Sequence, residues 1–229
     1  EHSSTSAGQS STVVVDTTVQ GFGDIDIGGS TDATGLFLVT WTPFQLIIVV
    51  ARADVMCRTY AVGGLLGATT NLAVQIGCGS GVATSRTAGP GERWAVVWTE
   101  DSAAGCLGGN IAFAVIASHG AVVQSRVAID TSVLNNDSFP DVAGDGTTFL
   151  ATWQRGASAP RDIMGAVIGP SGAGFAKLSA SLNLTQLEPG APLAGDQRGA
   201  RIEWDGCRYA YGYLEGTTPR PFLATLALD

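Results

Sequence analysis

The feature that most constrains the fold is an internal repeat built on a short aromatic and aliphatic run. Three segments align without gaps and end in Trp: Phe37–Trp41 (FLVTW), Trp94–Trp98 (WAVVW) and Phe149–Trp153 (FLATW). A fourth, Tyr209–Tyr213 (YAYGY), is placed in register by an Asp-Gly pair that begins four residues before it, as one does before Phe149. The last aromatic residues of the four runs stand 57, 55 and 60 residues apart. Self-similarity at a nearly fixed period indicates a repeat architecture.

A second sequence element recurs at a similar period. Asn110–Ile116 (NIAFAVI) and Asp162–Ile168 (DIMGAVI) match at an offset of 52 residues, and a Gly-Ala pair follows each at the same distance. Asp54–Met56 resembles the first copy of this element, and Phe222–Leu226 the last. Two independent elements with one period argue against coincidence.

Each unit is interpreted as four short strands. The first precedes a Gly-containing turn, as Phe139–Ala143 does, the second is the aromatic run, and the third is the Ile-rich run. The fourth follows a Gly turn, as in Leu72–Ile76 or Gln124–Ile129. Four-stranded units repeated every 40–60 residues, roughly, are typical of a β-propeller, so we predict an all-β propeller of four blades. The stretch Thr42–Ala53 is either the third strand of the first unit or an inserted strand.

The domain organisation follows from the repeat. Residues 1–11 are small and polar and are expected to form a flexible leader. Residues 12–229 form one domain, with units at roughly 20–77, 78–134, 135–188 and 189–229. Thr12–Asp16 has no unit of its own and is a candidate for the fourth strand of the last blade, because closing the ring in this way removes exposed sheet edges. The alternative is that further blades lie on another chain.

The units resemble a repeat of large exported bacterial surface proteins, with the approximate pattern P-x-V-A-x-D-G-x-x-F-L-V-x-W followed by D-I-x-G-x-x-x-x-P-x-G. The third unit carries it best, in Phe139–Trp153, Asp162–Gly165 and Gly169–Gly172. The resemblance covers roughly residues 20–229. It implies a propeller and export to the cell surface, and it implies no defined activity. The second unit departs from the pattern at Asn110, and the fourth lacks the Asp-Ile-x-Gly element.

Composition excludes several classes of protein. A net charge of −8 argues against nucleic-acid binding, which needs clustered basic residues. The share of hydrophobic residues is 45% and that of charged residues 14%, which is unlike a disordered chain. The longest apolar run, Leu46–Ala51, is far shorter than the about 20 residues of a membrane-spanning helix.

The four cysteines predict two disulfides and an oxidising, extracellular location, with buried free thiols as the alternative. There is no C-x-x-C motif, and the two histidines, His2 and His119, do not suit a Cys/His zinc site. In a propeller, the loops between second and third strands share a face with the connections between units. Cys78 and Cys106 would share that face and pair, and Cys57 and Cys207 would pair across the ring closure.

Catalytic and metal motifs are weak. No G-x-S-x-G, H-E-x-x-H or P-loop motif occurs, which argues against the common hydrolases. Paired carboxylates that could serve a glycosidase are Glu100 with Asp101, Asp141 with Asp145, and Glu203 with Asp205. Asp145 and Asp205 occupy matching places in two units, which a structural role in Asp-Gly turns explains better than catalysis does. Asp24, Asp26 and Asp32 are similar to the calcium loop of integrin-type propellers, so calcium is a candidate cofactor. The alternative is a strand with Ile25 and Ile27 inward and the aspartates outward.

The loops after the second strands, Thr99–Gly109 and Gln154–Arg161, are the longest, and loops on a rigid scaffold carry binding. The candidate ligand contacts there are Glu100, Asp101, Arg155 and Arg161. We therefore expect a non-catalytic extracellular module for binding, adhesion or surface assembly, whose partner is a protein or a glycan. The alternative is a lectin or carbohydrate-active hydrolase with its site on this loop face. The repeated tryptophans are expected in the core rather than in a sugar site.

Overall fold

The computed structural model describes residues 22–29, 35–47, 50–61, 64–74, 81–85, 93–101, 109–117, 120–131, 136–156, 159–186, 196–216 and 218–228. They form four antiparallel sheets, and their helical part is a single 3₁₀ turn, Leu184–Gln186. The predicted all-β fold class is confirmed at this level. Within these ranges no helix is long and apolar enough to cross a membrane. The leader 1–11, Thr12–Asp16 and both histidines lie outside the described residues.

Each sheet takes its strands from one continuous stretch of the chain. Sheet 1 contains β1 (Phe22–Gly29), β2 (Leu36–Ile47), β4 (Val55–Ala61) and β5 (Gly64–Ala73), with β3 (Val50–Ala53) paired to β2. Sheet 2 contains β6 (Val82–Thr84), β7 (Arg93–Asp101), β8 (Gly109–Ala117) and β9 (Val122–Asp130). Sheet 3 contains β10 (Ser138–Gly144), β11 (Phe149–Arg155), β12 (Asp162–Ser171) and β13 (Gly174–Lys177), with β14 (Leu182–Asn183) paired to β12. Sheet 4 contains β15 (Gln197–Trp204), β16 (Tyr209–Glu215) and β17 (Arg220–Leu226).

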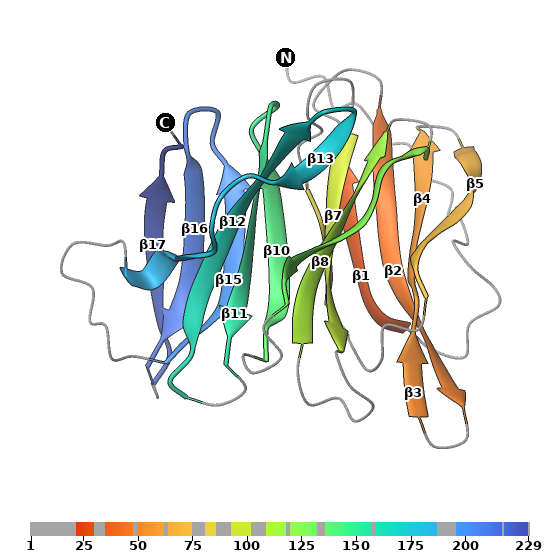
Figure 1. Ribbon diagram of the computed structural model, residues 1–229. Coiled ribbons are helices and arrows are strands. Elements are labelled where there is room, and N and C mark those ends of the chain that lie inside the picture. The colour runs from red at the N-terminus through yellow and green to blue at the C-terminus, as the bar shows by residue number, and fades with distance from the viewer. Residues whose placement is uncertain are drawn as a thin grey trace, which may run out of the picture.

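The sheets lie side by side in chain order, with sheet 4 at the left and sheet 1 at the right of Figure 1. Their first strands contact one another in series, β1 with β6, β6 with β10, and β10 with β15. We call these four strands the first-strand row. No sheet closes on itself, and a closed four-bladed ring stays a prediction.

Apolar side chains fill the spaces between neighbouring sheets. Trp94 and Trp98 pack with residues of sheet 1, Trp153 packs with residues of sheet 2, and Tyr209 and Tyr211 pack with residues of sheet 3. Because a middle sheet is covered on both faces, its strands are apolar on both sides, unlike a sheet with one face in water. The repeated tryptophans are fully buried, and Tyr213 is almost so, which confirms their predicted place in the core.

Two strand assignments in the first unit are now resolved. The Thr42–Ala53 stretch is not a third strand: it extends β2 and returns as the hairpin strand β3. The third strand is β4, which pairs with β2 along Leu36–Trp41, so the match of Asp54–Met56 to the repeat was correct. The fourth strand is β5, which ends at Ala73, whereas Leu72–Ile76 was expected. The register is set by the pairing of Ala61, the last residue of β4, with Gly64, the first residue of β5.

The predicted bond between Cys57 and Cys207 is not formed. Cys57 is buried between sheets 1 and 2, whereas Cys207 is exposed in the turn between β15 and β16, and both thiols are free. Burial raises the pKa of the Cys57 thiol to about 12, so it stays protonated and unreactive. Cys78 and Cys106 lie outside the described residues.

Candidate functional site

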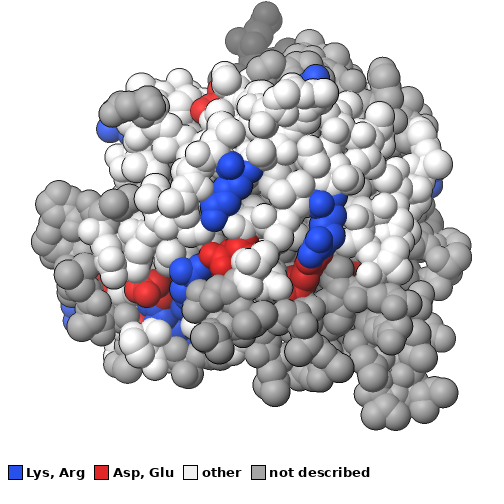
Figure 2. Space-filling model, in the orientation of Figure 1, with Lys and Arg blue, Asp and Glu red and all other residues white. Residues whose placement is uncertain are grey.

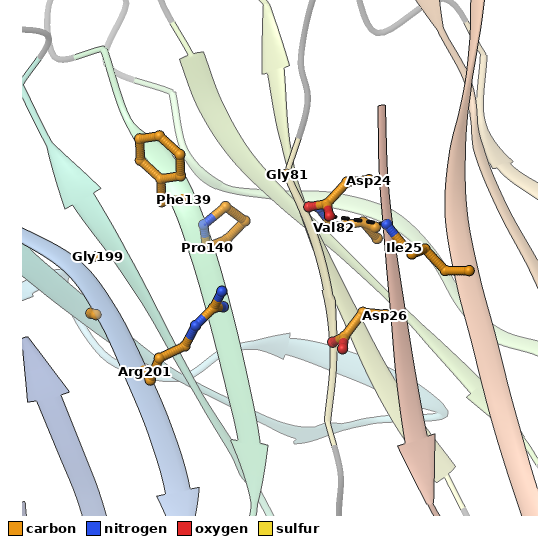
Figure 3. Close-up of a pocket in the computed structure, with 10 residues that line it drawn as sticks. Asp24, Ile25, Asp26, Gly81, Val82, Phe139, Pro140, Gly199 and Arg201 are labelled. Carbon is orange, nitrogen blue, oxygen red and sulfur yellow. Dashed lines mark hydrogen bonds between the residues drawn. The ribbon is translucent and has the colours of Figure 1, made fainter. Parts of the chain in front are cut away.

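A pocket of about 150 Å³ lies where the strands of the first-strand row begin. All four sheets contribute to its wall (Figure 3). Its polar and aromatic lining comes from Asp24 and Asp26 on β1, Phe139 on β10 and Arg201 on β15. Because first and second strands are antiparallel, the starts of the first strands lie beside the ends of the second strands, at the same end as the long predicted loops.

The repeat sets two of these side chains, Asp26 and Arg201, at equivalent positions in their sheets. Asp26 stands opposite Thr40, the next-to-last residue of the first aromatic run. The same position in the other sheets, opposite the next-to-last residue of each run, is occupied by Ala83, Asp141 and Arg201. The strand pairing thus sets one side chain from each sheet at the same level of the first-strand row, and two of the four are carboxylates.

These carboxylates bind the backbone of the neighbouring sheet. The N–H groups of Val82 and Thr84 on β6 donate to the Oδ2 atoms of Asp24 (3.1 Å) and Asp26 (2.7 Å). In the same way the N–H of Ile202 on β15 donates to Oδ2 of Asp141 at 3.0 Å. A carboxylate that accepts a backbone N–H satisfies a strand-edge donor that would otherwise be left unpaired.

The strand interpretation of Asp24–Ile27 is therefore correct, but its two faces are reversed. The aspartates face sheet 2, while Ile25 and Ile27 are 56% and 53% exposed. The free backbone donors of the short strand β6 draw the polar side chains inward, and alternation along the strand then turns the isoleucines outward.

Phe139 has an unusual backbone conformation at the edge of the pocket. The β10–β11 register shifts between Ser138 and Asp141, and Phe139 within this bulge has φ +49°, in the left-handed region. The equivalent bulge in sheet 4 has Gly199, with φ +64°, at the matching position. Glycine is the ordinary residue for this conformation, whereas a bulky side chain there is an outlier. The Phe139 side chain is 61% exposed, so packing in the core does not account for it.

The charges around the pocket come from opposite sides. In Figure 3 the Asp24 and Asp26 carboxylates extend from β1 toward β6, while the Arg201 guanidinium extends from β15 toward β10. The Arg201 side chain is 79% exposed and lies 3.9 Å from Asp141. Burial raises the pKa of Asp141 to about 6, with the Ile202 N–H and Arg201 opposing this rise. The pocket therefore offers fixed acceptors, an exposed donor and an exposed aromatic ring.

The described residues do not form the calcium site that the sequence suggested. Asp24 and Asp26 both accept backbone N–H groups, and Asp32 lies outside the described residues. Among the described residues no three His, Cys, Asp or Glu side chains come together as a metal site. A calcium site at Asp24, Asp26 and Asp32 stays a prediction.

The loop residues predicted as ligand contacts form ion pairs within the chain. Glu100 is buried, accepts two bonds from Arg126 (2.6 and 2.5 Å) and one from Trp98 Nε1 (2.8 Å). Arg155 bridges Asp130, at the end of β9, and Asp137, shortly before β10. Arg161 pairs with Asp196, just before β15, at 2.8 Å. Figure 2 shows basic and acidic side chains side by side across this region of the surface.

The Glu100 pair joins β7 to β9 within sheet 2, and the Arg155 pair joins sheet 3 to sheet 2. Each of these charges already has an intramolecular partner. The backbone of Asp101 pairs with Gly109 as the last residue of β7, and its side chain lies outside the described set. The structure thus gives Glu100, Arg155 and Arg161 a structural role, while ligand binding by them stays a prediction.

The turn aspartates also have structural partners. Asp145 accepts N–H groups from Thr147 and Thr148, and Asp205 does so from Cys207 and Arg208. Their predicted turn role is confirmed. Phe139 and Arg201 were missed as site residues, although the equivalence of Asp141 and Arg201, each eight residues before its aromatic run, was available from the sequence.

Comparison with known proteins finds no matching family model and no matching curated protein. Among solved structures, an alpha-L-arabinofuranosidase from Lactobacillus brevis aligns over 85% of this chain and 70% of its own, with 9% identity and a TM-score of 0.49. The C-terminal domain of gp131 from bacteriophage phiKZ aligns over 85% of this chain and 53% of its own, with 10% identity and a TM-score of 0.37. At these values neither likeness assigns an activity to this chain.

Proposed function

We propose that this chain is a non-catalytic extracellular binding module that recognises a glycan in the pocket of the first-strand row. Its four sheets would be the blades of a β-propeller, with the pocket at the axis. The observation that carries the proposal is the exposed Phe139 ring, held in a strained conformation beside Asp24, Asp26 and Arg201. Strain of this kind is concentrated at functional sites, where the surrounding structure maintains it.

The chemistry of the lining suits a sugar. Carboxylate oxygens accept hydrogen bonds from hydroxyl groups, and a guanidinium donates to hydroxyl and ring oxygens. An exposed aromatic ring can pack against the apolar C–H face of a pyranose. A pocket of about 150 Å³ holds one sugar residue more readily than a folded protein segment.

The surroundings of the carboxylates at the pocket favour glycan binding over glycan hydrolysis. A glycosidase needs one carboxyl group that donates a proton and a second that acts as base or nucleophile. Asp24 and Asp26 are both held by backbone N–H groups of β6. Asp141, the carboxyl with the raised pKa, is held by the N–H groups of Ile202 and Val142 and is not part of the pocket lining. The resemblance of the repeat to exported bacterial surface proteins supports an extracellular location.

The test is a glycan array probed with the purified chain and three variants. Phe139→Gly removes the ring, and Asp26→Asn removes a charge while keeping an acceptor for Thr84. Asp145→Asn is the matched control, because Asp145, like Asp26, accepts backbone N–H groups but lies after the end of β10, away from Phe139.

We expect a glycan that binds the unmodified chain and the control equally and binds both pocket variants at least about tenfold more weakly, since a hydrogen bond to a charged group contributes about 1.5–3 kcal/mol. Absence of any bound glycan would contradict the proposal. Equal binding by all four proteins would move the site away from the pocket.

A further inference from the structure

The charged side chains of the pocket lining differ from the loop charges in having few partners of opposite charge. The loop charges are taken up in the ion pairs described above. Among the described residues, the Asp24 and Asp26 carboxylates form no ion pair and accept only backbone N–H groups. Arg201 lies 3.9 Å from Asp141, the longest ion pair in the described part of the chain, and its side chain is 79% exposed. These three lining residues are therefore open to a ligand.

The charges line opposite walls of the pocket. In the first-strand row, β1 contacts β6, β6 contacts β10 and β10 contacts β15, so two strands separate the carboxylates on β1 from the guanidinium on β15. In Figure 3, Asp24 and Asp26 extend from one side of the pocket and Arg201 extends from the other. The lining thus has an acidic wall with two negative charges and a basic wall with one positive charge.

A neutral sugar would leave these charges without an opposite charge. A sugar that fills a pocket of about 150 Å³ displaces the water around the carboxylates and the guanidinium. Removing a charge from water is costly unless hydrogen bonds and an opposite charge replace the solvent. Hydroxyl groups replace only the hydrogen bonds, whereas a charged substituent also supplies the opposite charge. A ligand with matching charges should therefore bind this pocket more tightly than a neutral ligand of the same size.

We propose that the sugar recognised in this pocket is zwitterionic, with a protonated amino group against Asp24 and Asp26 and a carboxylate against Arg201. This inference rests on the proposed function and names its class of ligand. An ionised carboxylate offers about four lone pairs, and the described N–H groups use two at Asp24 and one at Asp26, so acceptor sites remain. An ammonium group brings three donors, and the planar guanidinium of Arg201 matches a carboxylate through two parallel N–H bonds.

A glycan array grouped by charge tests this assignment. It is probed at about pH 6.5, where an amino group with a pKa like that of an α-amine is protonated. The array presents four sets of glycans, whose terminal sugar carries neither charged group, a free amino group, a carboxylate, or both.

Two variants each remove the charge of one residue from a wall of the pocket. Asp26→Asn keeps an acceptor on the acidic wall, and Arg201→Gln keeps a donor on the basic wall. Arg198→Gln is the matched control for the arginine variant, because Arg198 lies on the same strand, β15, but outside the pocket lining. Asp145→Asn remains the control for the aspartate variant.

We expect the unmodified chain to bind the zwitterionic set at least about tenfold more tightly than the neutral set, with each singly charged set in between. Asp26→Asn should remove the gain from the amino group, Arg201→Gln should remove the gain from the carboxylate, and the controls should keep both gains. Equal binding of neutral and zwitterionic glycans, still lost in Phe139→Gly, would overturn this inference and leave the proposed function standing. A zwitterionic preference that survives in both variants would overturn it as well. Absence of any bound glycan would contradict the inference and the proposed function together.

Discussion

At Phe139 we predict that the glycine variant is more stable than the alanine variant, which is the reverse of the order in an ordinary strand. Both changes remove the ring, so their difference isolates the backbone conformation at φ +49°. A non-glycine residue in the left-handed region costs roughly 1–2 kcal/mol. Glycine loses about 0.5–1 kcal/mol more conformational entropy on folding than alanine does. The Phe139→Gly chain should therefore be more stable than the Phe139→Ala chain by about 0.5–1 kcal/mol, whereas in an ordinary strand alanine is favoured by a similar amount.

Urea unfolding of the two variants measures this difference directly. A difference of about 1 kcal/mol corresponds to about 2–4 °C in Tm for a chain of this size. The neighbouring pair Ser138→Gly and Ser138→Ala serves as the control, because Ser138 is not in the left-handed region and should favour alanine. If Phe139→Ala is as stable as Phe139→Gly or more so, Phe139 does not adopt the strained conformation on which the proposed site depends.

Three further perturbations test the electrostatics and the packing. The folded-state pKa of Asp141 is raised to about 6 from an ordinary 3.8, so the free energy of unfolding should fall as the pH rises from about 4 through 6. Asp141→Asn should reduce this fall by about 2–3 kcal/mol in urea unfolding, and an unchanged pH profile would refute the reasoning. Gly28→Ala should lower stability by about 1–3 kcal/mol in the same assay, since its Cβ would meet the carbonyl oxygen of Ser85, and an unaltered midpoint would contradict the close approach of sheets 1 and 2. Glu100→Ala should lower the free energy of unfolding by about 2 kcal/mol, because Trp98 Nε1 and Arg126 lose their acceptor. Glycan affinity should stay unchanged, and its loss in the folded variant would assign Glu100 to the site instead.

Most of what could be predicted about the fold came from the internal repeat. The aromatic runs at Phe37–Trp41, Trp94–Trp98 and Phe149–Trp153 are second strands, and their tryptophans are buried as expected. This succeeded because side chains packed between sheets impose the same apolar pattern on every unit. The β2–β3 hairpin departs from the repeat and could only be expected as one of two alternatives.

The site was harder to predict, because its residues depend on contacts between sheets. Alternation alone does not tell which face of β1 is buried, and the backbone donors of β6 reversed the intuitive choice for Asp24 and Ile25. The left-handed conformation of Phe139 arises from a bulge, which leaves no signal in a single phenylalanine. Arg155 looked free for a ligand, although it bridges Asp130 at the end of β9 and Asp137 just before β10.

The most direct test of the proposed site is a crystal structure of the chain with its strongest glycan from the array. We predict one sugar ring in van der Waals contact, within about 4 Å, of the Phe139 side chain, with hydroxyl groups donating to Asp24 or Asp26. A sugar bound elsewhere, with the pocket of the first-strand row empty, would contradict the account.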